Sequence, residues 1–209
     1  MTDEEIHPIE KGYVPTGTKV LVIGTFPPKK EYIDKKDGFF FYSSEKNQFW
    51  NRIDNIFPGQ QGLKKTKSKN SGENYKQNRL RKENFSKSKE LGFIDIFTKI
   101  KRKKASTKDE DLVPIETIIQ NGRLDEIVKR ESLKRICCTY TLAYEKLKCG
   151  LGLINYSVTQ VTDISTANGE KLLVTGHGKT FELVLLYPAT RSRHKGKLKD
   201  DQYKKYLFH

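Results

Sequence analysis

Four short apolar runs are the clearest feature of the hydrophobic pattern along this chain. The first, Lys19–Gly24, places four consecutive aliphatic residues before a glycine, which is typical of a strand buried on both faces. Three later runs have the same character: Gly92–Phe97, Leu133–Tyr140 and Thr180–Tyr187. Because they show so little alternation of polar and apolar positions, they favour a parallel sheet.

The segments between these runs show the spacing of amphipathic helices. From Asn47 to Phe57 the apolar residues recur every three or four positions, which favours a helix with one buried face. Strands that alternate with helices predict an α/β sandwich around a mainly parallel sheet. Further helices are predicted at residues 74–89, 115–119, 124–130, 142–148 and 200–207.

The length of the chain favours a single domain over residues 1–209, because little chain remains for a second core. Residues 58–72 are rich in Gly, Lys and Ser, so we expect a flexible basic insertion near residues 58–90. Within residues 152–178 the glycines Gly169, Gly176 and Gly178 indicate turns, and a hairpin would fit there.

The charge of the chain points to a polyanionic partner. The formal net charge is +14, and it is concentrated in two stretches. Residues 61–104 hold 15 Lys and Arg against 4 Asp and Glu, and residues 189–209 hold 7 against 2. Such localised charge favours a nucleic-acid-binding face, although solvated charged loops remain the alternative.

The cysteines, the lengths of the apolar runs and the N-terminus indicate the cellular compartment, and missing motifs exclude some enzyme classes. Three cysteines without a CxxC pair argue against a disulfide framework and for a reducing compartment. No apolar run approaches the ~20 residues of a membrane span, and the acidic N-terminus lacks a signal-peptide pattern. We expect a soluble, cytoplasmic protein, associated with the nucleoid if it is bacterial. No P-loop, GxGxxG, HExxH or Cys/His cluster is present, so kinases, dehydrogenases and zinc deaminases lack support.

Polar and aromatic residues follow the predicted strands. GTFPP follows the first strand, a basic run follows the second, and YPATRSRH follows the fourth. The loops after the carboxyl ends of parallel strands meet at one edge of a sheet, where ligands bind. The chain also has an aromatic cluster, Phe39–Tyr42. Together, the polar loops, the basic segments and this cluster suit an enzyme that extracts a base from DNA and stacks it against an aromatic ring.

Four ordered motifs carry a resemblance to a known family. GTFP (24–27), FYSSEKNQFW (41–50), LGFIDIFTKIKRKKAS (91–106) and LLYPATRSRH (185–194) together resemble the uracil-DNA glycosylase superfamily. The similarity spans about residues 19–209 and is greatest to the mismatch-specific uracil/thymine and hypoxanthine-DNA glycosylase-like branches. It implies a three-layer α/β/α sandwich around a four-stranded, mainly parallel sheet. It also implies an enzyme that, with no metal and no cofactor, hydrolyses the N-glycosidic bond of a flipped base in DNA and leaves an abasic site. We expect a monomer.

The resemblance also implies roles for the first two motifs. Gly24, Thr25, Phe26 and Pro27 would line the base pocket. Phe26 stands where the mismatch-specific enzymes hold Asn, and it can neither donate nor accept a hydrogen bond.

The second motif supplies two more candidates for the pocket. Tyr42 would stack on the extruded base, or it could simply close the core. Asn47 would contact the ligand or its loop, or cap the following helix. Trp50 lies on the apolar stripe of the predicted helix, so we expect it in the core.

Two basic segments are candidates for DNA contacts. The last motif occupies the place of the family's DNA-inserting loop, and a histidine within it could stabilise the leaving base or lie in solvent. The second segment follows the second strand, where cations would meet phosphates. The candidates are Pro188, Thr190, Arg191, Ser192, Arg193, His194 and Lys195 in the first segment, and Lys101, Arg102, Lys103, Lys104 and Ser106 in the second.

With Phe26 unsuitable, the catalytic polar group must lie elsewhere. Asp95 lies within a buried strand, where an acid must be paired or do chemistry, and Asp109 follows the basic run. Either could position water, and either could instead have a structural role. Three hypotheses therefore stay open: a DNA glycosylase acting on uracil or another deaminated or mispaired base, an inactive relative that binds unusual or uracil-containing DNA, and an RNA- or nucleotide-binding α/β domain.

Overall fold

A mixed sheet of six strands forms the centre of the fold, with the order β3-β2-β6-β9-β8-β7. The structure is a computed structural model that describes residues 3–29, 39–43, 47–59, 62–63, 75–104, 108–161, 170–189 and 196–209. The strands are β2 (Val20–Gly24), β3 (Leu91–Asp95), β6 (Arg135–Cys138), β7 (Ser157–Gln160), β8 (Lys171–Gly176) and β9 (Lys179–Leu185). The strands β3, β2, β6 and β9 are parallel neighbours, and they confirm the four runs predicted to be strands.

The expectation of a four-stranded sheet is wrong, because two further strands, β8 and β7, extend the sheet beyond β9. β8 pairs antiparallel with β9, and β7 pairs antiparallel with β8. His177 and Gly178 join β8 to β9 with φ values of 50° and 73°, as a tight hairpin turn with two left-handed residues requires. The glycines indicated this turn, but neither added strand has a continuous apolar run: β8 alternates buried with more exposed positions, and β7 is mostly exposed.

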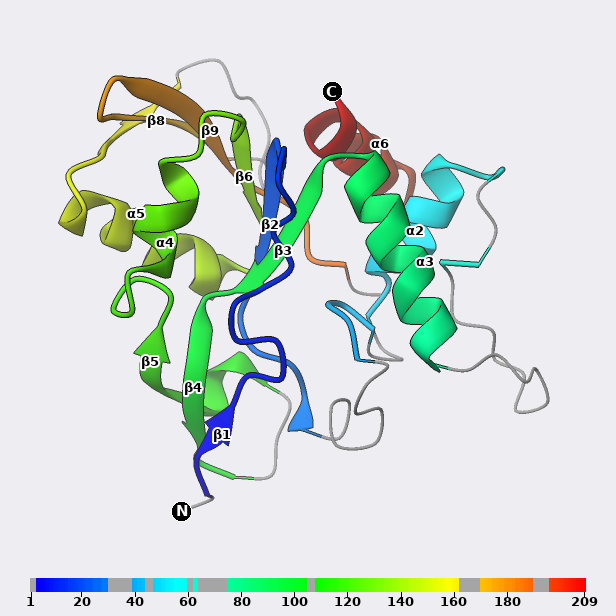
Figure 1. The fold of residues 1–209 in the computed structure, drawn as a ribbon, viewed down its shortest axis with the longest axis horizontal. Helices are drawn as coiled ribbons and strands as arrows, with labels where there is room; N and C mark the ends of the chain where they lie inside the picture. The colour runs from blue at the N-terminus through cyan, green and yellow to red at the C-terminus, as the bar shows by residue number, and fades with distance from the viewer. Residues whose placement is uncertain are drawn as a thin grey trace.

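A second sheet of three strands, with the order β1-β4-β5, extends from the first. Its strands are β1 (Glu5–Ile6), β4 (Phe97–Arg102) and β5 (Leu112–Thr117). Only Ile96 separates β3 from β4, so the chain runs from one sheet directly into the other (Figure 1). The helix predicted at residues 115–119 is therefore wrong: most of that segment pairs antiparallel with β4 as an edge strand, a position that tolerates Pro114.

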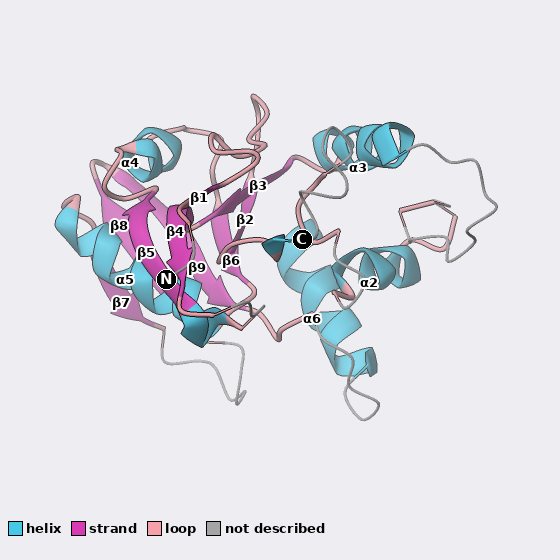
Figure 2. Ribbon diagram, turned by 90° about the horizontal axis from the view of Figure 1, so that it is seen from below, coloured by secondary structure: helices cyan, strands magenta, loops and turns pink. Residues whose placement is uncertain are grey.

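Helices lie against both faces of the main sheet (Figure 1, Figure 2). On one face, α4 (Arg123–Val128) and α5 (Thr141–Leu153) pack against a cluster that includes Leu21 and Ile23 of β2. On the other, α2 (Phe49–Ile56), α3 (Tyr75–Ser88) and α6 (Gly196–Phe208) pack against a cluster that includes Val20 and Val22. Successive β2 side chains thus enter opposite cores, which explains the continuous apolar run.

The flexible insertion expected near residues 58–90 is described only in part. Residues 60–61 and 64–74 of the expected flexible insertion lie outside the described residues, whereas residues 75–88 form the helix α3, with Phe85 in the core. Over the described ranges, no helix is both long and apolar enough to cross a membrane.

An aromatic cluster fixes the segment before α2 against the sheet. Trp50 is almost fully buried, as expected, and its Nε1 donates to the carbonyl oxygen of Phe41 at 2.8 Å. The rings of Phe40, Phe49 and Phe93 lie within 6.0 Å of the Trp50 ring, centroid to centroid. This packing holds the loop that carries Tyr42 next to the carboxyl ends of the strands.

Replacing Trp50 with Ala should lower the free energy of unfolding by about 3–5 kcal/mol, as large-to-small aromatic changes in cores do. Urea denaturation measures this loss. Leu153→Ala is the control, because Leu153 is 78% exposed at the end of α5 and should change stability by no more than about 0.5 kcal/mol. Equal midpoints for the two variants would contradict the role of Trp50 in the core.

Candidate functional site

The candidate site lies where three parallel strands of the main sheet end. Gly24 at the end of β2 pairs with Asp95 at the end of β3, and Ile23 pairs with Cys138 at the end of β6. The next residues after β6 are Thr139 and Tyr140. The register of the sheet therefore brings Gly24, Asp95 and Tyr140 to the same edge, as the parallel arrangement predicts.

The carboxylate of Asp95 lies directly beside the backbone of Gly24. A Cβ atom built on Gly24 would be 2.3 Å from Asp95 Oδ1 and 3.0 Å from the Tyr42 hydroxyl oxygen. The Tyr42 hydroxyl also shares a hydrogen bond of 3.1 Å with Thr139 Oγ1. A carboxylate, a phenol and a hydroxyl thus surround a position where no side chain larger than that of glycine fits.

His7 holds the other oxygen of Asp95, and it is a residue that sequence reasoning missed. Its Nε2 lies 3.0 Å from Asp95 Oδ2, and its Nδ1 accepts the backbone N–H of Ile9 at 3.0 Å. Because Nδ1 is an acceptor, the proton of a neutral imidazole is on Nε2, which donates to Asp95. No local pattern marks this pair, because 88 positions separate the two residues.

The second predicted carboxylate, Asp109, joins the same edge through Thr25. Thr25 Oγ1 donates to Asp109 Oδ1 at 2.9 Å, and Asp109 begins the short 3₁₀ helix η2 (Asp109–Asp111) that precedes β5. Burial raises the pKa of the Asp109 carboxyl and the Asp95 carboxylate adds to this, although the Thr25 hydrogen bond and Arg102 act in the opposite direction. The protein thus favours the protonated form of Asp109 more than water does.

Asn47 and Tyr140 close the site from the side of α2. The amide oxygen of Asn47 accepts the backbone N–H of Phe49 at 2.9 Å, and its Nδ2 points to the Tyr140 hydroxyl at 3.4 Å. Asn47 therefore accepts one N–H at the start of α2, although Gln48 is the N-cap residue of this helix. Burial, with Asp109 and Asp95 adding to it, raises the pKa of Tyr140 to about 12, so this missed residue is a neutral hydroxyl.

Tyr42 has one ring face against the protein. Its ring stacks on Phe49 with centroids 4.6 Å apart and planes 19° apart, and the residue is half-buried. Burial of the hydroxyl and then the charge of Asp95 raise its pKa well above the ordinary value. Tyr42 thus contributes both to the aromatic core and to the polar edge.

Phe26 and Arg102 form a structural unit behind the site. Phe26 is buried, and the Arg102 guanidinium lies 5.8 Å from its ring centroid. Arg102 Nε donates to both carboxylate oxygens of Glu5, at 3.1 and 3.2 Å, and its Nη2 donates to the Pro27 carbonyl oxygen at 2.8 Å.

The placement of Arg102 corrects the expectation that it meets phosphate. Its side chain is 4% exposed, because β4 directs alternate side chains inward. Arg102 instead holds the chain after Gly24 in place through Pro27.

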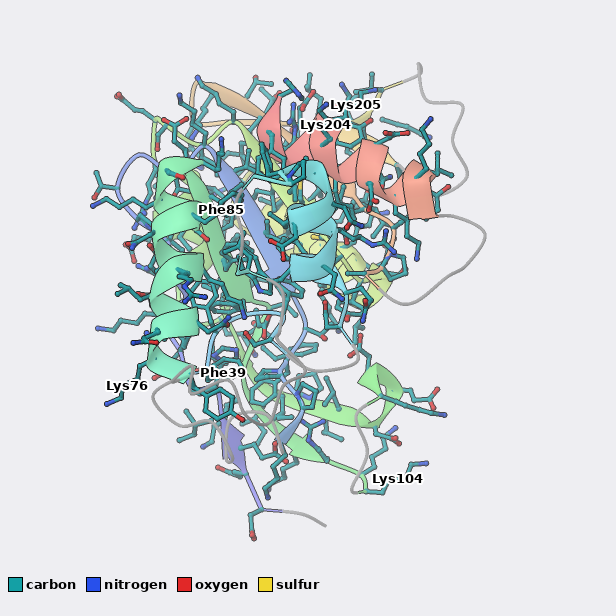
Figure 3. The ribbon with its side chains drawn as sticks, turned by 90° about the vertical axis from the view of Figure 1, so that its right-hand side faces the viewer. Phe39, Lys76, Phe85, Lys104, Lys204 and Lys205 are labelled. Carbon is teal, nitrogen blue, oxygen red and sulfur yellow. The ribbon has the colours of Figure 1, made fainter. Side chains whose placement is uncertain are left out.

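The remaining predicted cations differ in exposure. Lys103 and Lys104 are exposed and Lys101 is half-buried. Figure 3 shows Lys104 at the far end of the second sheet, well apart from Lys76 on α3 and from Lys204 and Lys205 on α6. The Lys103 N–H donates to the Asp111 carbonyl oxygen at 2.9 Å, which ties this basic end to η2 and so to Asp109.

The last predicted segment is described only in part. Pro188 is exposed and its carbonyl oxygen accepts Lys199 Nζ at 3.0 Å, while the backbone N–H of Gln48 donates to the Ala189 carbonyl oxygen at 2.7 Å. These contacts bring the chain after β9 next to the start of α2. Seven predicted DNA contacts lie outside the described residues: Ser106, Thr190, Arg191, Ser192, Arg193, His194 and Lys195.

Comparison with solved structures shows a similarity of fold. No protein-family model matches the chain, and no curated protein matches it. The fold is similar to the solution NMR structure of a "putative Uracil DNA glycosylase" from Methanosarcina acetivorans, with a TM-score of 0.50 and 18% sequence identity over 96% of this chain and 99% of that chain. The similarity to this structure is one of fold. At this identity it assigns no activity to the chain.

Replacing Gly24 with Ala should destabilise the protein by about 1–3 kcal/mol, the usual cost of overpacking, because the new methyl group would overlap Asp95 Oδ1. Gly152→Ala is the matched control, since a Cβ there would meet nothing within 4 Å and alanine favours the helix by about 0.5–1 kcal/mol. Chemical denaturation compares the two. A Gly24 variant as stable as the wild type would refute the close approach of the carboxylate.

Proposed function

We propose that the protein is a monofunctional DNA glycosylase that hydrolyses the N-glycosidic bond of a flipped uracil or another deaminated base. The observation that carries the proposal is the Asp95 carboxylate at the Gly24 backbone, with a second carboxyl group, an amide donor and an aromatic ring at the same sheet edge. The fold similarity supports the same reaction class. The localised positive charge supports DNA as the partner.

Hydrolysis of a glycosidic bond needs a group that positions water and offsets positive charge on the sugar. Asp95 suits this role because His7 occupies Oδ2, which leaves Oδ1 at the Gly24 backbone. In the proposed step, water adds to the anomeric carbon and gives its proton to Asp95. The base leaves with the electron pair of the broken bond.

Asp109 suits the complementary role. Burial raises the pKa of its carboxyl group, and Thr25 donates to Oδ1, so Oδ2 is the oxygen that would act on the base. Two carboxyl groups with different environments at one edge can divide acid and base functions. We therefore assign proton donation toward the departing base to Asp109.

The pocket for the base would use Tyr42 and Asn47. The Tyr42 ring has Phe49 on one face, so its other face would take the base, and stacking contributes about 1–3 kcal/mol per base. The Asn47 amide nitrogen has two N–H groups, of which one donates to the Tyr140 hydroxyl, and the other would donate to the base. A donor there favours a base with a carbonyl oxygen, as uracil and hypoxanthine have, over one with an amino group.

The alternative is a protein of this fold that binds unusual DNA without cleaving it. Phe26 favours it, because a buried phenylalanine stands where the resemblance implies a water-positioning asparagine. Under the glycosylase proposal, the carboxylate of Asp95 takes the water-positioning role of that asparagine. The two hypotheses therefore differ in whether changing Asp95 affects chemistry or only stability.

Incubation with single-stranded and duplex oligonucleotides that carry uracil, hypoxanthine, xanthine or mismatched thymine, followed by alkali, tests this directly. At least one lesion should yield an abasic site. Asp95→Asn should lower the single-turnover rate by about 100-fold or more, as loss of a positioned acid or base does.

Asp109→Asn should also slow the reaction, and Asp201→Asn, at an exposed position of α6, should not. If every lesion survives while the protein binds the same DNA, the non-cleaving alternative replaces the proposal.

The exposed lysines at the end of β4 should contact phosphates. Lys103→Gln combined with Lys104→Gln should reduce the slope of log affinity against log salt by about 0.9 for each lost contact. Lys129→Gln combined with Lys146→Gln removes the same charge from the α4 and α5 side and is the control. Fluorescence anisotropy with lesion-free duplex measures both slopes, and equal slopes would place the phosphates elsewhere.

A further inference from the structure

The N-terminal segment reaches into the candidate site although it belongs to none of the motifs. β1 pairs with β4 through Glu5 opposite Ile100 and Ile6 opposite Lys99, and the His7 N–H then donates to the Thr98 carbonyl oxygen at 2.9 Å. Glu5 and His7 are each 4% exposed, whereas Ile6 between them is 60% exposed. The extended chain thus directs two polar side chains inward, where they need partners.

His7 is held rigidly by its surroundings. Its ring stacks on Phe41 at 5.6 Å and meets Phe26 edge to face at 5.3 Å, with Phe39 at 6.3 Å. The Ile9 N–H fixes the tautomer from the other side of the ring. The donor Nε2–H therefore has a single direction, toward Asp95 Oδ2.

The second inward side chain supports the opposite wall of the site. Glu5 accepts from Arg102, and Arg102 donates to the Pro27 carbonyl oxygen and covers the Phe26 ring. A reacting group is positioned accurately when the residues around it are themselves held in place. Here one segment holds both the Asp95 carboxylate and the loop after Gly24.

We infer that His7 is a positioning residue for Asp95: its Nε2–H holds Oδ2, so that Oδ1 stays directed at the Gly24 backbone, where the sugar and water would bind. The inference rests on the proposed function. It differs from a merely structural role, because an apolar pair would fill the same space without directing an oxygen toward the site.

Single-turnover base release, measured over a range of protein concentrations, tests the inference. His7→Phe suits the surrounding phenylalanine rings but removes the donor. His7→Gln places an amide N–H near the position of Nε2. Ile6→Thr is the control on the same strand, because Ile6 faces solvent.

The saturating rate of His7→Phe should fall by about 100-fold, which is the effect of a misplaced reacting group. The protein concentration at half-saturation should stay within about threefold of the wild-type value, because phosphate contacts govern binding. His7→Gln should recover at least about a tenth of the wild-type rate, since a donor is restored. Ile6→Thr should match the wild type.

A double-mutant cycle separates positioning from stability. His7→Phe should add no further loss to Asp95→Asn, because a residue that acts only through Asp95 has no effect once that carboxylate is gone. This comparison also remains valid if His7→Phe alone unfolds, since the double variant contains no unpaired buried carboxylate.

Several results would overturn the inference. They are a full rate for His7→Phe, a His7→Gln variant that is folded but as slow as His7→Phe, and an additional loss on the Asp95→Asn background. A wild-type protein that releases no base from any substrate would instead overturn the proposed function, and the inference with it.

Discussion

The close approach of the Asp95 carboxylate to the backbone of Gly24 is the constraint on which the site depends. It requires parallel pairing of β2 with β3 in one register, a glycine at the end of β2, and a partner for the second carboxylate oxygen. A buried carboxylate costs several kcal/mol unless it is hydrogen-bonded. The hydrogen bond from His7 offsets that cost and leaves the first oxygen at the sheet edge.

Buried charge also connects the two sheets. Arg102 pairs with Glu5 and donates to Pro27, so a cation within the most basic run of the chain is used inside the protein. Its neighbours Lys103 and Lys104 are exposed and remain candidates for phosphate contacts. The same basic run therefore places one cation inside the protein, at the end of β4, and leaves the next two exposed.

The aromatic residues around the start of α2 pack together against the sheet. Trp50 and Phe49 pack against Phe93 of β3 and so fix the start of α2. Tyr42 stacks on Phe49, and its hydroxyl is hydrogen-bonded to Thr139. Rigid aromatic packing below a half-buried tyrosine limits its motion. A ring held in this way would receive a planar ligand with little further loss of conformational entropy.

The sequence alone determined the parallel strands and the loops at their ends, because continuous apolar runs and Gly-Pro breaks are local signals. It also marked Asp95, since an acid in a buried strand needs a partner, and Trp50 through its helical spacing. Only the tertiary structure decided that β5 is a strand, that Arg102 points inward and that the partner of Asp95 is His7. The pairing of β1 with β4 brings His7 next to Asp95. These two residues lie 88 positions apart in the sequence, so no local pattern marks them.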